Sequence, residues 1–478
     1  MPCSGDPRIP RSSRPDAGRD SSGESQGEIH ETIAAVITPP GQGGVAAVRV
    51  AGPDSRAILE RVFRPTSSDH PSPFLMRHGR IIVQSGDILD EVLAVFMPAG
   101  RSYTGLDQVE IFCHGGSQVV RMLLDLILAS GARPAEPGEF TKLAFLNGRI
   151  DLAQAEAVAE LIASSTRVSH QAGRDHLTGS YSSYVDELRS RLLTTLADLE
   201  ASIDFSDDDV AGVELHRMKD DLGEIGSHVT RLAETYRGGR IIREGFRVAI
   251  CGRSNAGKSS LFNLLLAQER ALVDPEAGTT RDFLSEWIDL DGFAVNLIDT
   301  AGLRESSNRV ELQGQAKATE IIEKADLIVW LADISQPEWR LSLEEDTKAL
   351  SDKSILLVVN KIDLLETARV ELPDNLLPLS CVTRVGLDEL RGKIVSSINE
   401  GMPDLTSGQV VTSARHKYCL DQAGDCVKRA VERVYSGESD EIVAFELRQA
   451  ADKLGEITGK VYTEEILGQV FSRFCIGK

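Results

Sequence analysis

The chain has no cysteines in a C-x-x-C arrangement and no long apolar run. Its seven cysteines lie at positions 3, 113, 251, 381, 419, 426 and 475 of 478 residues. This spacing predicts neither a zinc ribbon nor a disulfide framework. No segment approaches the ~18 apolar residues of a membrane helix, and no charged stretch followed by an apolar one opens the sequence. We therefore expect a cytoplasmic protein.

The sequence also lacks a surplus of basic residues. The formal net charge is −21, from 52 Lys and Arg against 73 Asp and Glu. Because broad nucleic-acid surfaces are basic, any contact with RNA is expected to be local or shared with a partner. Apolar residues make up 41% and charged residues 26%, as in ordinary globular proteins, and the length suffices for about three domains.

Residues 1–30 contain few apolar side chains and many Ser, Gly, Arg and Pro. Such a composition cannot supply a core, so we predict a disordered tail. A transit peptide is the alternative, because four arginines lie between positions 8 and 19. Five acidic residues within residues 1–30 argue against it, since transit peptides are poor in acids.

The strongest motif is the stretch Gly252–Ser259, GRSNAGKS. It follows the apolar run 246–251 and precedes the helix-like run 260–266, so its backbone N–H groups can cradle phosphates. We expect Lys258 to reach the β- and γ-phosphates and the Ser259 hydroxyl to bind Mg²⁺. A glycine-rich turn without a ligand is the alternative, and the complete eight-residue pattern argues against it.

Three later segments predict a guanine nucleotide. Asp299–Gly302 ends a strand-like run, where a carboxylate would lie beside the γ-phosphate. Asn360–Asp363 ends another, and the Asp363 carboxylate can accept both N–H groups on guanine's Watson–Crick edge, a pair that adenine lacks. Between these motifs and the phosphate loop, Thr280 can offer a hydroxyl to Mg²⁺. Together the segments predict a GTPase.

The flanking regions predict two further modules. From about Thr32 to Asn147 short strand-like runs and one amphipathic helix indicate an α+β module. From Asp151, a plausible N-cap, to about Phe205 the pattern is helical, and the same pattern resumes after the nucleotide-binding region. Apolar residues of the second helical part are Leu420, Ala423, Val427, Ala430, Val434, Ile442, Phe445, Leu454 and Ile457.

We therefore predict a multidomain chain that combines α+β and α/β folds. A tail covers residues 1–30, a β-rich N-terminal domain covers 31–147, and one discontinuous helical bundle covers 148–244 and 401–478. A Ras-like P-loop domain covers 245–400 and interrupts this bundle, because neither half can bury its apolar stripe alone. The ends of the insert must lie close together.

From about Glu31 to Lys478 the sequence resembles the bacterial tRNA modification GTPases of the MnmE (TrmE) family. The motifs that carry the resemblance are Thr38–Val45, Tyr103–Gly105 with Val109–Ile111 and His114–Gly116, Pro137–Thr141, Phe145–Glu156 and Phe474–Lys478. The resemblance implies an N-terminal domain that dimerises and binds 5-formyl- or methylene-tetrahydrofolate. It also implies a complex with the FAD-dependent protein MnmG (GidA) that adds an aminomethyl or carboxymethylaminomethyl group to C5 of the wobble uridine of tRNA.

The resemblance assigns folate binding to Arg49, Glu110, Arg149 and Lys478, and a catalytic role in modification to Cys475. From the residues alone, Arg49 and Glu110 form a strand-edge ion pair, and Cys475 is a buried small residue or an incidental exposed thiol. Arg149 replaces a lysine that is frequent in the family, which keeps the charge and changes the donor geometry.

Leu303 follows Asp299–Gly302 at the place where Ras-like GTPases carry a glutamine that orients water. Leucine cannot do this. The resemblance assigns the task to Glu311 and assigns a K⁺ ion to the phosphate loop, where two G domains meet face to face. On sequence alone, Glu311 is a surface helix residue.

The resemblance also completes the nucleotide and metal sites. Mg²⁺ ligands would be Ser259 and Thr280, and K⁺ ligands would be Asn255, Asp274, Glu276 and Thr279. The GTP-binding residues would be Asn255, Ala256, Gly257, Lys258, Ser259, Ser260, Asp274, Pro275, Glu276, Ala277, Gly278, Thr279, Thr280, Asp299, Thr300, Ala301, Gly302, Asn360, Lys361, Ile362, Asp363, Ser380, Cys381 and Val382.

Two classes of function remain open at this point. One is a GTP-hydrolysing subunit of a tRNA-modifying complex, which the ending Phe474–Lys478 and the β-rich N-terminal module favour. The other is a regulatory or ribosome-assembly GTPase that acts as a binding switch. An RNA-binding module after the G domain would favour the second class, and the sequence contains no pattern typical of one.

Overall fold

The computed structural model describes residues 31–67, 72–204, 211–272, 284–300, 319–348, 350, 352–365, 372–400, 402 and 408–478. The predicted tail, 1–30, lies outside this part. The chain divides into two compact units. Unit 1 comprises Met1–Ser102 and Leu106–Ala135, and unit 2 comprises Tyr103–Gly105 and Glu136–Lys478. Among the described helices, none combines the length and the apolar character needed to cross a membrane.

Unit 1 contains a seven-stranded sheet in the order β3-β4-β5-β6-β2-β1-β7. Its neighbouring strands are antiparallel, except that β1 and β7 are parallel. Alternate residues of the strands pack on helices α1 and α2, which gives the predicted α+β fold. The elements are β1 (Ile33–Val36), β2 (Gly43–Ala51), α1 (Ser55–Val62), β3 (Phe63–Pro65), β4 (Arg77–Ile82), β5 (Ile88–Met97), β6 (Gln108–Gly115), α2 (Ser117–Ala129) and β7 (Arg133–Pro134).

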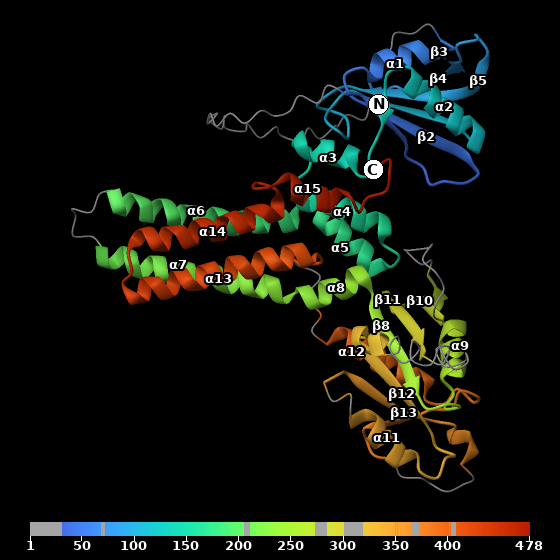
Figure 1. Ribbon diagram of the computed structural model, residues 1–478, viewed down its shortest axis with the longest axis vertical. Helices are drawn as coiled ribbons and strands as arrows, with labels where there is room; N and C mark the ends of the chain where they lie inside the picture. Colours follow the sequence, from blue (N-terminus) through green and yellow to red (C-terminus); the bar gives the residue numbers. More distant parts are fainter. Residues whose placement is uncertain are drawn as a thin grey trace, which may run out of the picture. The chain divides into compact units, whose positions relative to one another are not determined.

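Unit 2 contains a second seven-stranded sheet, in the order β14-β13-β12-β8-β11-β10-β9. The central strand β8 is parallel to both β11 and β12, as in a doubly wound α/β fold (Figure 1). The sheet and its helices comprise β8 (Phe246–Gly252), α9 (Lys258–Gln268), β9 (Arg270–Ala271), β10 (Leu284–Leu290), β11 (Phe293–Asp299), β12 (Leu327–Asp333), α11 (Trp339–Lys348), β13 (Ile355–Asn360), the 3₁₀ segment η2 (Ile362–Leu364), β14 (Leu376–Pro378) and α12 (Leu387–Asn399).

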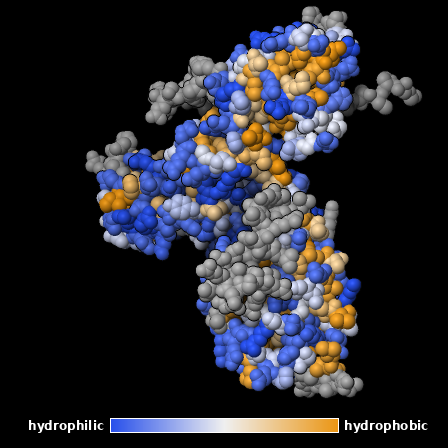
Figure 2. Space-filling view, turned by 45° about the vertical axis from the view of Figure 1, so that its right-hand side comes forward, coloured by the Kyte–Doolittle hydropathy of each residue, from blue (hydrophilic) through white to orange (hydrophobic). Residues whose placement is uncertain are grey.

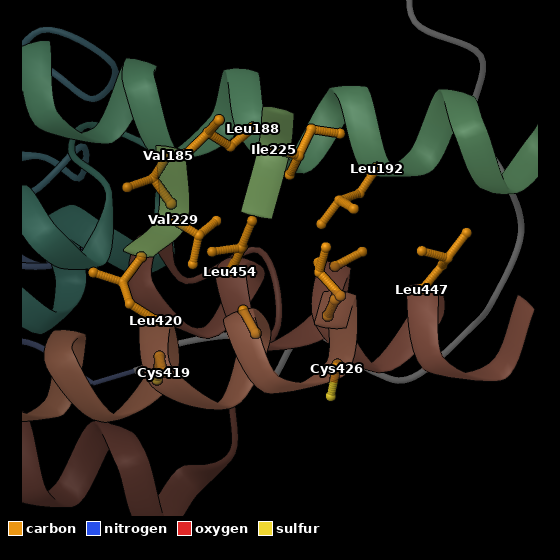
Figure 3. Packing of buried hydrophobic residues seen from close by; sticks show 14 of the residues in the cluster. Val185, Leu188, Leu192, Ile225, Val229, Cys419, Leu420, Cys426, Leu447 and Leu454 are labelled. Atoms are coloured by element: carbon orange, nitrogen blue, oxygen red, sulfur yellow. The ribbon is translucent and has the colours of Figure 1, made fainter. Parts of the chain in front are cut away.

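The same unit contains a bundle of four long helices from both sides of the second sheet in sequence. These are α6 (Ser180–Asp204), α7 (Ala211–Glu234), α13 (Ala414–Ser436) and α14 (Asp440–Thr458). One core joins them, so the two helical parts bury their apolar stripes against each other (Figure 3). Shorter helices accompany the bundle, namely α3 (Glu139–Leu146), α4 (Leu152–Ala163), α5 (Arg167–Leu177), α8 (Tyr236–Glu244) and α15 (Glu464–Phe471).

The start of α4 confirms the predicted cap. The Asp151 carboxylate accepts a hydrogen bond from the Gln154 N–H at 2.8 Å, and the Gln154 side chain accepts one from the Asp151 N–H at 3.0 Å. This reciprocal arrangement is a capping box, which satisfies backbone donors that the first helical turn leaves unpaired. It fixes the point at which α4 begins.

The prediction for the face of α14 was wrong at two positions. Ile442 and Phe445 are 39% and 57% exposed, whereas Val443, Ala444 and Leu447 are buried in the bundle core. Each residue advances about 100° around a helix, so the buried stripe is offset from the predicted one. Tertiary packing against α6 and α13 selects this face, and the short apolar pattern of α14 fits either choice.

Leu420 offers a test of the shared core, because it is fully buried between helices from both sides of the second sheet. We expect Leu420→Ala to reduce the free energy of unfolding by about 2–5 kcal/mol, since it removes buried methyl groups and leaves a cavity. Phe445→Ala, at an exposed position of α14, should change it by less than about 0.5 kcal/mol. Urea unfolding followed by circular dichroism measures both, and equal effects would contradict the packing.

Candidate functional site

The phosphate loop joins β8 to α9, as predicted, and its glycines are sterically required. Gly257 has φ +100°, and a Cβ there would lie 2.2 Å from Asn360 Nδ2. Gly252 has φ +139°, and a Cβ there would lie 2.3 Å from the Leu331 carbonyl oxygen. Asn255, at the bend of the loop, has φ +63°. These backbone angles favour glycine and, at one position, asparagine.

Lys258 and Ser259 begin α9 at the centre of the site. The Lys258 ammonium donates to the carbonyl oxygens of Gly252 and Arg253 at 3.0 and 2.9 Å, which holds it across the loop. The Ser259 hydroxyl donates to the carboxylate of the buried Asp299 at 2.7 Å. A hydroxyl and a carboxylate side by side are oxygen ligands of the kind that Mg²⁺ prefers.

Asn360 ties the phosphate loop to the predicted base-binding segments. Its side-chain N–H donates to the carbonyl oxygen of the buried Ala256 at 2.8 Å, and its Oδ1 accepts from the Cys381 N–H at 3.2 Å. The Asp363 carboxylate is exposed and accepts from the hydroxyl of the buried Ser380 at 2.5 Å. This contact fixes the orientation of the Asp363 carboxylate.

Four predicted residues surround these contacts without taking part in them. Ser260 is exposed in the first turn of α9, Ile362 begins η2, and Val382 is 81% exposed. The Thr300 hydroxyl donates to the Ile250 carbonyl oxygen at 2.9 Å, so it supports strand β8. The predicted residues Asp274, Pro275, Glu276, Ala277, Gly278, Thr279, Thr280, Ala301, Gly302 and Glu311 lie outside the described residues.

Asp333 is a site residue that the sequence analysis missed. It ends β12, and its carboxylate pairs with the Lys361 ammonium at 2.6 Å. Burial opposes ionisation of Asp333, but hydrogen bonds from Lys361 and Ser335 outweigh it and hold its pKa below the usual value. The sequence offered one signal for Asp333, an acidic residue at the end of an apolar strand-like run. Its role is to position Lys361, whose backbone is left-handed with φ +67°.

The residues assigned to folate divide between the two units. In unit 1, Arg49 and Glu110 face each other across β2 and β6, and their side chains pair at 2.9 Å with only 15% and 16% exposed. In unit 2, the Arg149 N–H donates to the Ala144 carbonyl oxygen at 2.9 Å. The predicted ion pair is therefore present, but it joins two interior strands of the sheet rather than lying at a strand edge.

The C-terminal tail is held against α3 and α15. The Phe474 ring packs against that of Phe471, with 5.5 Å between centroids, and the Lys478 carbonyl oxygen accepts from the Phe140 N–H at 3.1 Å. Cys475 is exposed and has a free thiol. The tail thus presents its cysteine to solvent from an ordered backbone. Among the described residues, no three His, Cys, Asp or Glu side chains gather as a metal site.

A phosphate loop with its lysine, a hydroxyl–carboxylate pair for a cation and an Asn-Lys-x-Asp segment on a doubly wound sheet define a P-loop GTPase. Models of two protein families also match the chain. The "MnmE helical domain" matches residues 152–475, and the "GTP-binding protein TrmE N-terminus" matches residues 32–149. The chain belongs to the MnmE family of tRNA modification GTPases, and the switch-only alternative is not favoured.

Similar proteins cover nearly the whole chain. The tRNA modification GTPase MnmE of Natranaerobius thermophilus is 42% identical over 459 residues, which cover 94% of this chain and 99% of that protein. The protein of the same name from Thermoanaerobacter sp. is 38% identical over 460 residues, with 94% and 100% covered. The G domain of the T. maritima FeoB iron transporter is 29% identical, covering 32% of this chain and 98% of that domain, with a TM-score of 0.24.

Proposed function

We propose that this chain hydrolyses GTP to drive the addition of an aminomethyl or carboxymethylaminomethyl group to C5 of the wobble uridine of tRNA. Likeness to tRNA modification GTPases over 94% of the chain carries this proposal, together with the geometry of the GTP site. Within it, residues 31–147 form the folate domain, 245–400 form the G domain, and 148–244 with 401–478 form the helical domain. The site of action is the cytoplasm.

In the G domain, the loop Gly252–Ser259 holds the phosphates and Asp363 selects guanine. Ser259 would bind Mg²⁺ with Thr280, and the carboxylate of Asp299 beside the Ser259 hydroxyl supports this assignment. Mg²⁺ neutralises charge on the phosphate oxygens when bound. Lys258 is already directed across the loop by two carbonyl contacts, so little ordering remains when a phosphate replaces them.

Hydrolysis also needs a group that positions water, since Leu303 cannot. We assign this role to Glu311, and a K⁺ site to Asn255 with Asp274, Glu276 and Thr279. Asn255 is exposed at the bend of the phosphate loop, which supports access of a monovalent ion to that point. The ion would stabilise transition-state charge, with two G domains face to face.

The one-carbon unit would come from 5-formyl- or methylene-tetrahydrofolate, and its candidate contacts in unit 1 are Arg49 and Glu110. The half-buried Arg49–Glu110 pair supplies a fixed cation and anion for the polar parts of such a ligand. Cys475, exposed near the chain end, is the candidate for covalent chemistry. The FAD-dependent protein MnmG would complete the modifying complex.

Homodimerisation would occur through unit 1. Figure 2 shows apolar residues gathered on the surface of this unit, at the top of the view. Exposed apolar side chains of unit 1 include Val45, Leu75, Ile88 and Leu93, which are 63%, 49%, 53% and 40% exposed. Apolar area of this kind is typical of surfaces that a protein partner covers.

We expect Glu311→Ala to leave GTP binding close to normal and to reduce hydrolysis by roughly two orders of magnitude, the scale of lost water positioning. Hydrolysis by the wild type should be faster in K⁺ than in Na⁺, and Asn255→Ala should remove that preference. Phosphate release in each salt measures both effects. Glu320→Ala, in a surface ion pair with Lys324, serves as control.

Two results would contradict the roles of Glu311 and K⁺. Glu311→Ala with a wild-type turnover number, or a wild-type rate that is the same in both salts, would remove Glu311 or K⁺ from the mechanism.

A further inference from the structure

The two chain segments that connect the bundle to the G domain lie in contact with each other. Helix α8 leads into β8, and residues 408–413 lead back into α13. The Val411 N–H donates to the Thr235 hydroxyl at 2.9 Å. A Cβ on Gly239 would lie 2.1 Å from the Val411 carbonyl oxygen, so glycine is required for this close approach. A shift of one connection therefore displaces the other.

One buried carboxylate, that of Glu160 in α4, contacts both connections. It accepts a hydrogen bond from the Thr412 hydroxyl at 2.8 Å on the return connection, and it lies 3.5 Å from the Arg243 guanidinium at the end of α8. Its other oxygen lies 3.5 Å from His176 Nδ1 in α5. Burial opposes its charge, but His176, Arg243 and Thr412 together hold the pKa of Glu160 below the usual value.

The surroundings of His176 favour its charged form. Its Nε2 lies 2.7 Å from the Val410 carbonyl oxygen, which can only accept a hydrogen bond. Its Nδ1 faces the Glu160 carboxylate, which also accepts. Nε2 therefore donates, and Nδ1 lies at ion-pair distance from a carboxylate, an arrangement that favours the imidazolium. Consistently, the hydrogen bond and charge of Glu160 outweigh burial and raise the pKa of His176.

Helix α4 extends from these contacts to the tail. Glu156, one turn before Glu160, pairs with Arg415 at 2.7 Å and with His416 at 3.2 Å, directly after the return connection. The first residues of α4 lie in a different cluster. There Leu152 and Ala155 pack with Leu467, Val470, Phe471 and Phe474, the side chains that seat the C-terminal tail. Figure 1 shows α4 beside α5 and α15.

We propose that α4 transmits changes at the G-domain connections to the C-terminal tail, and that Glu160 is the positioning residue that fixes both connections to it. The inference rests on the proposed function, in which GTP hydrolysis and the tail serve one reaction. A helix of 12 residues is about 18 Å long and moves as a rod. Contacts at its two ends are therefore coupled through rigid secondary structure, without a ligand shared between them.

The test compares Glu160→Gln with Glu224→Gln in the full chain. Glu224 also pairs with an arginine and a histidine, Arg191 and His228, but it is 58% exposed and touches neither connection. Hydrogen exchange of residues 464–478 is measured with and without GDP, aluminium fluoride and K⁺. We expect the tail to respond to the nucleotide in the wild type and in Glu224→Gln. In Glu160→Gln the response should be lost while GTP hydrolysis stays close to the wild-type rate.

The modification rate with tRNA and the FAD-dependent partner should fall about tenfold in Glu160→Gln, the scale of a typical coupling between sites. Thr412→Val removes one contact without leaving a buried cation, so it provides a milder variant in the same direction should Glu160→Gln fold poorly. A merely structural role would lower thermal stability and leave the nucleotide response of the tail intact.

The outcomes separate the inference from the proposed function. Suppose that the wild type hydrolyses GTP and modifies tRNA. If the tail of Glu160→Gln or Thr412→Val then responds to the nucleotide as in the wild type, and the variant modifies tRNA at the wild-type rate, the role of Glu160 is overturned. A wild-type tail that ignores the nucleotide overturns the role of α4. If the wild type itself modifies no tRNA, the proposed function fails instead.

Discussion

Asp363→Asn will weaken GTP binding by roughly 10²–10⁴-fold and turn the preference toward xanthosine triphosphate. The wild-type carboxylate can accept two hydrogen bonds from guanine, each worth about 1.5–3 kcal/mol with a charged acceptor. The amide of asparagine offers one donor and one acceptor, which suits xanthine. The Ser380 hydroxyl that orients Asp363 remains in place to orient the amide.

Nucleotide affinities measured by isothermal titration provide the check. Asp388→Asn is the matched control, because its side chain is 94% exposed in α12 and pairs with Arg391. It should leave both affinities unchanged. An Asp363→Asn protein that keeps the wild-type affinity for GTP would show that Asp363 does not read the base.

Deletion of Cys475–Lys478 will abolish tRNA modification and leave GTP hydrolysis nearly intact. Ile476 forms a β-bridge with Pro137, and the Lys478 carbonyl oxygen accepts from the Phe140 N–H in α3. These contacts lie far in sequence from the sheet that carries the nucleotide site, and none of the four residues belongs to the core of that sheet. Phe474, which anchors the tail in its apolar cluster, is retained in this truncation. The remaining fold should therefore survive.

Cys475→Ser separates the thiol from the rest of the tail. If the thiol carries covalent chemistry, this single change should reduce modification as strongly as the deletion. Nucleoside analysis of tRNA and phosphate release are measured on the same preparations. Parallel loss of hydrolysis in the truncated protein would contradict the separation of roles.

The phosphate loop and the Asn-Lys-x-Asp segment were predictable because their geometry is local. A glycine-rich loop between a buried strand and a helix has few conformations, and Gly252 and Gly257 adopt the backbone angles that this arrangement requires. The pair of Asp333 and Lys361 was harder to foresee. It joins the ends of adjacent parallel strands, and their order is set by the whole sheet.

Contacts in the helical region show the limit of sequence patterns more clearly. Apolar spacing predicted that two half bundles share a core, but the register of α14 depends on its neighbours, so Ile442 and Phe445 were misplaced. The contacts of Glu160 with Thr412 and of His176 with Val410 join residues 252 and 234 positions apart. No local sequence pattern predicts a contact between residues so far apart in the chain.

The central claim, that the GTPase serves tRNA modification, is tested most directly by mass spectrometry of tRNA nucleosides. The measurement uses a bacterial strain whose own MnmE gene is deleted, with and without this chain expressed from a plasmid, and Lys258→Ala as the control without nucleotide binding. We expect the wild-type chain to restore the aminomethyl- or carboxymethylaminomethyl-derived uridines, and Lys258→Ala to leave them absent. Nucleoside profiles that stay those of the deletion strain, although the expressed chain hydrolyses GTP, would contradict the account.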